Sequence, residues 1–161
     1  MGMGSNMKNN LRILLEYLME DNDNDSVTLY HGTLKENVPS ILSGGLEVSS
    51  GWGGAGTKGV YLSKDPSGAE YWAKIAYMSK NEEPLEPEKF DRKYGDKKED
   101  LISILRIVIP ASETKNLKAD MEQAEDYGFD DGSEDWQQSL DVIGDVMYAG
   151  DIPSSWITVL Q

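Results

Sequence analysis

The chain has 161 residues and a formal net charge of −14 at pH 7, with 29 Asp and Glu residues against 15 Lys and Arg residues. Such acidity repels phosphate backbones, so a nucleic-acid substrate is disfavoured. It either keeps the protein soluble or recruits a basic partner. The absence of cysteine excludes disulfides and thiolate zinc sites, and a single histidine argues against a histidine-based metal centre, so no metal is expected.

Hydrophobic residues make up 39% of the chain, but none of their runs approaches the roughly 18 residues of a membrane-spanning helix. No leader segment is recognisable, so we expect a cytoplasmic protein with no membrane partner. We expect residues 1–26 to form an N-terminal helix and an acidic linker. Residues 27–161 are expected to form a single domain with a continuous core.

Four leucines near the N-terminus have the i, i+3, i+4, i+7 spacing of an amphipathic helix: Leu11, Leu14, Leu15 and Leu18. The Asp and Asn residues at positions 21–25 alternate as in a calcium loop, but the glycine and the closing glutamate of such a loop are missing. We therefore interpret this run as a solvated linker.

The β-branched and aromatic residues 27–30 predict a strand, which His31 would close. Gly32 would then let a ligand approach the backbone, because glycine carries no side chain. Residues 35–42 predict a short helix with its proline in the first turn, and residues 46–48 predict the start of another strand.

Residues 51–59 are rich in glycine and partly match two phosphate-binding patterns. They contain the G-x-G-x-x-G spacing of dinucleotide sites and a P-loop whose last two residues are reversed. Both patterns need a helix directly afterwards, because the helix N-terminus holds the phosphate. Residues 59–63 predict a strand instead, so we reject both patterns and expect a glycine loop at the mouth of a cleft, with Trp52 as a candidate cover.

The rest of the chain mixes strands with charged segments. Residues 66–78 predict a helix with Ala69, Trp72, Ala73 and Ala76 on its buried face. We expect exposed acidic insertions at about 80–100 and 124–139, a central strand at 101–109, a short helix at 119–125 and late strands at 142–148 and 156–160. Regular βαβ alternation is missing, which predicts an α+β fold with mostly antiparallel pairing.

Three motifs follow one another in a suggestive order: Tyr30-His31-Gly32-Thr33, Gly59-Val60-Tyr61-Leu62-Ser63 and Ala69-Glu70-Tyr71. This order resembles the ADP-ribosyltransferases of the His-Tyr branch, which includes the poly(ADP-ribose) polymerases and is akin to the RNA 2′-phosphotransferases. The ending at residues 148–160 is similar to that of small bacterial and phage members. The resemblance covers about residues 27–161 and implies two mostly antiparallel sheets around an NAD cleft, with flanking helices.

The resemblance implies that NAD is the co-substrate and that six residues bind it: His31, Gly32, Thr33, Tyr61, Ser63 and Tyr71. His31 would contact a ribose hydroxyl, and the backbone of Gly32 would hold the nicotinamide amide. Tyr61 and Tyr71 would enclose the flat cationic ring, which suits aromatic faces. Each tyrosine has the alternative role of packing in the core.

The family's third catalytic position is a glutamate at the start of a late strand, and here the best-placed acid is Asp145. Together with His31 and Tyr61 it completes the expected catalytic set. Aspartate is one methylene shorter, and a slip in register would put Gly144 or Ile143 there instead. Family members without the glutamate are typically limited to single transfers. The phosphotransferase alternative is weaker, because its basic residues for a phosphorylated RNA end have no evident match.

Two functions therefore stay open. The first is an NAD-dependent mono-ADP-ribosyltransferase with a macromolecular acceptor, expected to be a protein because an acidic surface suits a basic partner. The second is a catalytically inactive acidic protein of the same fold that occupies a basic host partner.

Overall fold

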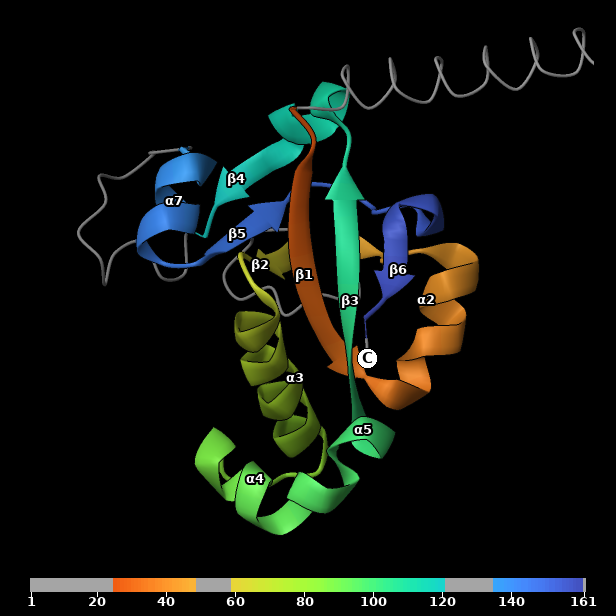
Figure 1. Ribbon diagram of the computed structural model, residues 1–161, viewed down its shortest axis with the longest axis vertical. Helices are drawn as coiled ribbons and strands as arrows, with labels where there is room; N and C mark the ends of the chain where they lie inside the picture. The colour runs from red at the N-terminus through yellow and green to blue at the C-terminus, as the bar shows by residue number, and fades with distance from the viewer. Residues whose placement is uncertain (1–24, 49–58, 121–134, 161) are drawn as a thin grey trace, which may run out of the picture.

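The computed structural model describes residues 25–48, 59–120 and 135–160. Its strands form one six-stranded antiparallel sheet in the order β4-β5-β2-β1-β3-β6 (Figure 1). The strands are β1 (Val27–Leu34), β2 (Val60–Ser63), β3 (Ile102–Ile109), β4 (Leu117–Ala119), β5 (Asp145–Tyr148) and β6 (Ile157–Val159). The antiparallel α+β class is confirmed, but the described strands belong to one sheet rather than the two expected.

Five α-helices surround the described part of the sheet. They are α2 (Val38–Gly44), α3 (Pro66–Lys80), α4 (Pro87–Tyr94), α5 (Lys98–Leu101) and α7 (Trp136–Val142). Short 3-10 turns occupy Lys35–Asn37, Gly95–Lys97, Ala111–Asn116 and Ser154–Trp156. The start of α3 follows from its sequence, because Pro66 opens the first turn and the Asp65 side chain accepts the Gly68 backbone N–H at 2.9 Å. None of the described helices is long and apolar enough to cross a membrane.

β1 is longer than the sequence predicts. All eight of its residues pair with β3, from Val27 opposite Ile109 to Leu34 opposite Ile102. His31 therefore lies inside the strand and does not close it. The prediction was wrong because the pairing with β3 outweighs the weak strand preference of glycine.

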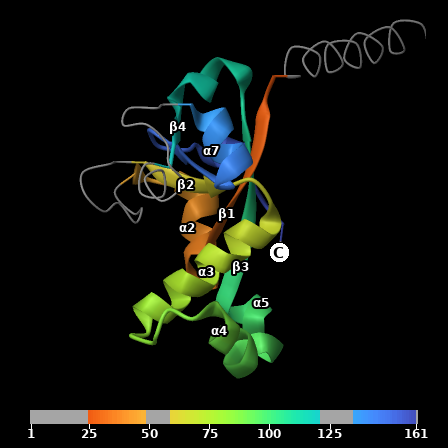
Figure 2. The same ribbon diagram turned by 90° about the vertical axis from the view of Figure 1, so that its left-hand side faces the viewer.

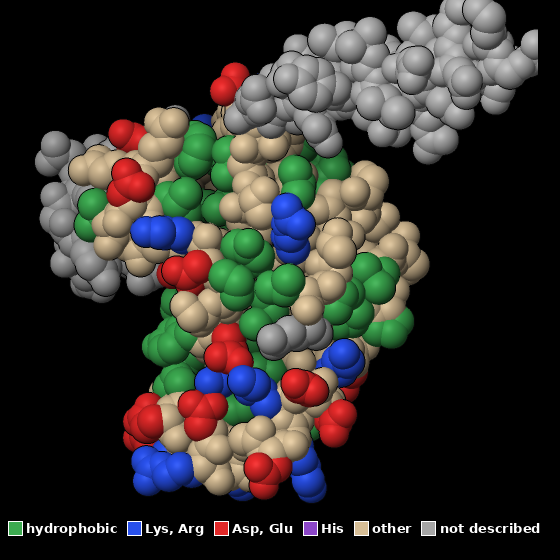
Figure 3. All heavy atoms as spheres, viewed as in Figure 1, with side chains coloured by type: hydrophobic (Ala, Val, Ile, Leu, Met, Phe, Trp, Pro, Cys, Tyr) green, Lys and Arg blue, Asp and Glu red, His purple; other side chains and the backbone are tan. Residues whose placement is uncertain are grey.

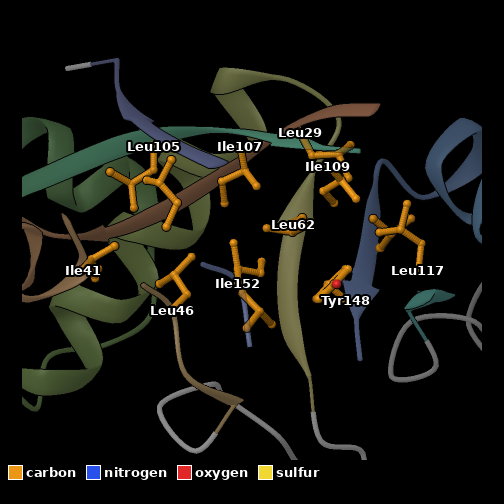
Figure 4. Packing of buried hydrophobic residues seen from close by; sticks show 13 residues of the cluster. Leu29, Ile41, Leu46, Leu62, Leu105, Ile107, Ile109, Leu117, Tyr148 and Ile152 are labelled. Carbon is orange, nitrogen blue, oxygen red and sulfur yellow. The ribbon is translucent and has the colours of Figure 1, made fainter. Parts of the chain in front are cut away.

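The main core lies on one face of the sheet (Figure 4). Leu29, Leu62 and Ile107 from three neighbouring strands meet Ile41 of α2 and Ile152 of the C-terminal segment there. All five side chains are at most 7% exposed. Burial of large aliphatic side chains is worth about 1.5–3 kcal/mol each, so this cluster stabilises the packing of the sheet against α2.

The opposite face is covered by α3, which crosses β1 at Gly32. A Cβ atom on Gly32 would lie 1.8 Å from the backbone oxygen of Ala69 and 2.9 Å from the Ala73 Cβ. The missing side chain therefore makes room for a helix. Our expectation that this glycine opens space for a ligand was wrong for that side of the residue.

The segment at residues 80–100 is mostly exposed, as its charge predicts, but it is also ordered by helices. It folds into α4, a 3-10 turn and α5, which lie beyond the end of the sheet beside α3 (Figures 1 and 2). Phe90 is 1% exposed and packs edge to face against Tyr77 of α3 at 5.6 Å between ring centroids. One aromatic anchor thus orders a segment whose exposed positions are charged.

Ion pairs join this end of the molecule to α3. The Nζ of Lys74 in α3 lies 2.7 Å from the Oδ1 of Asp91 in α4. The Oε1 of Glu70 in α3 lies 2.6 Å from the Nζ of Lys98 in α5. Charged side chains of both signs crowd this end in the space-filling view (Figure 3). Because the Lys74 side chain is 10% exposed, its pair is screened less than a surface pair would be.

Three smaller expectations also need correction. Residues 46–48 form no strand, since Leu46 makes only an isolated antiparallel bridge to Ile152. Residue 119 ends β4 and does not begin a helix. The late strands start at residues 145 and 157, because α7 continues to Val142 and Gly144, with φ of +91°, turns the chain into β5. The expectations for residues 9–18, 51–58 and 121–134 lie outside the described residues.

We predict that Gly32→Ala lowers the free energy of unfolding by about 1–3 kcal/mol or more, because α3 must move away from β1 to admit the new Cβ. Urea unfolding measures the change. Gly95→Ala is the matched control, since a Cβ there meets no atom within 4 Å and the φ of −52° is helical. This control should be neutral or slightly stabilising. Equal stability of the two variants would contradict the proposed crossing.

Candidate active site

β1 and β2 are paired at one position only, Tyr30 opposite Ser63. Two residues further along β1, a regular ladder would put Gly32 opposite Tyr61, but that pair is not formed. The two central strands of the sheet therefore separate beyond Tyr30. His31, Gly32 and Tyr61, three of the predicted site residues, stand at this separation.

The direction of the Gly32 backbone groups follows from the ladder on the other side of β1. The Leu160 N–H donates to the Ile104 oxygen at 2.9 Å, so the backbone groups of Ile104 face β6. Gly32 lies opposite Ile104. In an antiparallel ladder both residues of such a pair direct their N–H and C=O groups away from each other. The N–H and C=O of Gly32 therefore face the β2 side, where the two strands separate.

β2 presents a matching backbone group. The Lys64 N–H donates to the Gly144 oxygen at 2.8 Å, so the backbone of Lys64 faces β5. Backbone direction alternates along a strand, and the backbone of Tyr61, three residues earlier, therefore faces β1. A regular ladder would give the Tyr61 backbone oxygen a hydrogen bond from a β1 backbone N–H. Here the oxygen lies 2.8 Å from His31 Nδ1 instead.

This contact fixes the state of the imidazole. A carbonyl oxygen only accepts hydrogen bonds, so Nδ1 carries the proton and donates. In the neutral ring Nε2 is then the acceptor. Burial lowers the pKa of His31 from 6.5, and the hydrogen bond to Tyr61 opposes this effect only in part. At neutral pH the ring is uncharged and offers one acceptor nitrogen to a hydroxyl group.

A second group of site residues lies on the side covered by α3. Asp145 begins β5 opposite Ser63 and is 8% exposed. The Ser63 Oγ donates to the Asp145 Oδ1 at 2.7 Å, and the Trp72 Nε1 donates to the Asp145 Oδ2 at 3.1 Å. Asp145 is therefore a buried carboxylate held by two side-chain donors and not a surface residue.

The remaining predicted residues differ in exposure. Thr33 is 7% exposed and thus buried in the strand, whereas Tyr61 is half-buried. Tyr71 is 47% exposed, and its ring meets that of Trp72 edge to face at 5.0 Å between centroids. The structure thus brings His31 together with Tyr61, and Ser63 with Asp145, and leaves the Tyr71 ring open to solvent.

Sequence reasoning missed the part played by Trp72. Helical spacing placed it on the buried face of α3, yet it is 38% exposed and bonded to a carboxylate. Spacing reports which face of a helix a residue is on, but not that an indole N–H meets an acid 73 positions later. The one available signal was its place directly after Tyr71.

The described residues contain no group of three or more His, Cys, Asp or Glu side chains that could hold a metal ion. No protein-family model matches the sequence, and no curated protein matches it either.

We predict that His31 titrates below pH 6.5, because burial disfavours the imidazolium. It is the only histidine in the chain, so the single set of imidazole NMR signals belongs to His31, and no mutants are needed to assign it. Its nitrogen shifts at pH 8 should show the tautomer protonated at Nδ1. A midpoint at or above 6.5 would contradict the partly buried ring with its hydrogen bond to the Tyr61 carbonyl.

The same shift makes folding pH-dependent. Between the folded pKa and the unfolded value near 6.5, the unfolded chain binds a proton that the folded chain does not. The contribution of His31 to the free energy of unfolding is therefore complete above pH 6.5 and is lost as the pH falls toward the folded pKa. Urea unfolding of the protein and of His31→Gln, compared from pH 7.5 to 5, isolates this term. Parallel pH curves would contradict it.

Proposed function

We propose that the protein cleaves the nicotinamide–ribose bond of NAD and transfers one ADP-ribose unit to a macromolecular acceptor. The observation that carries the proposal is the separation of β1 from β2 at Gly32, whose backbone groups face β2 beside the neutral imidazole of His31. The order of the three motifs, which resembles the His-Tyr ADP-ribosyltransferases, supports the same activity.

The backbone of Gly32 suits the carboxamide of nicotinamide. That group carries one carbonyl acceptor and one amide donor, and a strand residue with both backbone groups turned to one side offers the complementary pair. This N–H and C=O belong to the backbone and do not depend on a side chain. The residue is glycine because α3 already occupies the space where a Cβ would stand.

His31 acts as the hydrogen-bond acceptor for a ribose hydroxyl. Its Nδ1–H is held by the Tyr61 carbonyl, so Nε2 keeps its lone pair for the ligand. Because burial lowers the pKa of the ring, it stays neutral near NAD, whose nicotinamide is cationic. Tyr61 and the exposed ring of Tyr71 supply aromatic faces for that cation.

Asp145 acts as the electrostatic stabiliser of the reaction. As the bond between the ribose C1′ and the nicotinamide nitrogen breaks, its electron pair leaves with neutral nicotinamide and positive charge grows on the ribose. A fixed carboxylate lowers the energy of that oxocarbenium-like state. The acceptor's nucleophile then bonds to C1′ and gives up its proton to the solvent. Asp145 lies two strands from Tyr30, about 10 Å across the sheet, a distance set by strand spacing.

The acceptor class follows from charge. With a net charge of −14, the protein attracts basic surfaces and repels nucleic acids, so we propose a basic protein as acceptor. The aspartate in place of the family's glutamate favours a single transfer over chain growth.

The primary test is release of nicotinamide from NAD by the purified protein. We expect His31→Ala to abolish release, and Asp145→Asn to lower kcat on the order of 100-fold with little change in KM. Asp141→Asn is the matched control, because Asp141 is exposed on α7 four residues away. An inactive wild-type protein with native unfolding behaviour would contradict the transferase and favour the acidic binding protein.

Stability must be measured beside activity, because Asp145 is buried. Asparagine has one acceptor oxygen where the carboxylate serves both Ser63 and Trp72. One donor loses its partner in Asp145→Asn, which costs about 1–3 kcal/mol. Rates are therefore compared at a temperature where urea unfolding shows both proteins folded. Labelled NAD and a lysate identify the acceptor: label confined to nucleic acid would contradict the protein acceptor.

A further inference from the structure

We infer that Trp72 is a positioning residue that fixes the Asp145 carboxylate and couples it to the Tyr71 ring. The geometric part of this inference is that the Trp72 N–H binds the Asp145 carboxylate while the Trp72 ring contacts Tyr71. The catalytic part deepens the proposed function and rests on it.

Two donors hold the two oxygens of one carboxylate. The Ser63 Oγ reaches Oδ1 at 2.7 Å from the neighbouring strand, and the Trp72 Nε1 reaches Oδ2 at 3.1 Å from α3. One donor alone leaves the group free to rotate about its Cβ–Cγ bond, whereas donors on different oxygens fix its plane. Hydrogen bonds to an ionised acceptor are also roughly twice as strong as neutral ones. The sheet and the helix thus set the carboxylate together.

Burial does not account for the orientation of Trp72. The residue is 38% exposed, although indole gains most when it is removed from water. Its ring is placed so that the N–H donates to Asp145 and the ring forms a T-shaped contact with Tyr71, with 5.0 Å between the centroids and an interplanar angle of 86°. The polar contact and the aromatic contact together explain an orientation that apolar packing does not.

A fixed carboxylate matters more for aspartate than for glutamate. The shorter side chain cannot extend toward a substrate, so its orientation must be set by its neighbours. Stabilisation of a developing charge requires groups that are already in place when the charge forms. Trp72 provides this for Asp145, and through the same ring it holds Tyr71, which the proposed function places over the nicotinamide.

The kinetic test is Trp72→Phe, which removes the N–H donor and keeps an aromatic ring against Tyr71. We expect kcat for nicotinamide release to fall on the order of tenfold, with little change in KM. Trp156→Phe is the matched control, because Trp156 packs edge to face against Tyr148 of the main core. It should keep the wild-type kcat. An unchanged kcat in Trp72→Phe would overturn the catalytic part.

A double variant separates positioning from general weakening of the fold. If Trp72 acts through Asp145, then Trp72→Phe combined with Asp145→Asn should be no slower than Asp145→Asn alone. Losses that multiply would mean that Trp72 acts by another route, and would overturn the role assigned to it.

The contact itself is tested without NAD. Four tryptophans give four indole N–H signals in a ¹⁵N correlation spectrum, and the Trp72 signal is the one missing from Trp72→Phe. We expect Asp145→Asn to shift this signal and leave the other three in place. An unmoved signal would overturn the geometric part. A shifted signal in a protein that releases no nicotinamide would keep the contact and overturn the catalytic role together with the proposed function.

Discussion

The crossing of α3 over β1 at Gly32 is the contact on which the rest of the site depends. The Ala69 oxygen occupies the place of a side chain, so helix and strand approach as closely as two backbones can. From that crossing α3 carries Trp72 to Asp145. It also leaves the ring of Tyr71 in solvent beside them. A larger residue at position 32 would displace these side chains from the sheet together.

The separation of β1 from β2 has its own cause and consequence. A ladder that continued past Tyr30 would satisfy the Tyr61 oxygen with a backbone N–H, but the imidazole of His31 takes that place. The hydrogen bond from the His31 side chain therefore replaces one backbone hydrogen bond that β2 would make with β1 in a regular ladder. Because buried backbone oxygens need a donor, loss of the imidazole would remove a hydrogen-bond donor from the Tyr61 backbone oxygen.

The sequence was most informative where local pattern and tertiary structure agree. The helix at residues 66–78 was predicted from its cap and alanine spacing, and the strand at 101–109 from its β-branched run. Local pattern failed where distant partners decide. β3 extends β1 past Gly32, and Phe90 orders a charged segment. In the candidate site, motif order predicted His31 and Tyr61, and the start of a late strand predicted Asp145, but the hydrogen bond between Asp145 and Trp72 depends on how α3 lies on the sheet.

The charged segment beside α3 also restrains the helix that carries Trp72. Lys74 and Glu70 occupy α3 on either side of Tyr71 and Trp72, and each is paired with a residue from α4 or α5. Such pairs add little free energy where water screens them, but a pair with one side chain nearly buried restricts rotation of the helix about its axis. The buried Phe90 side chain packs against α3 and holds the segment there. The ion pairs therefore hold α3 on both sides of the residue that contacts Asp145.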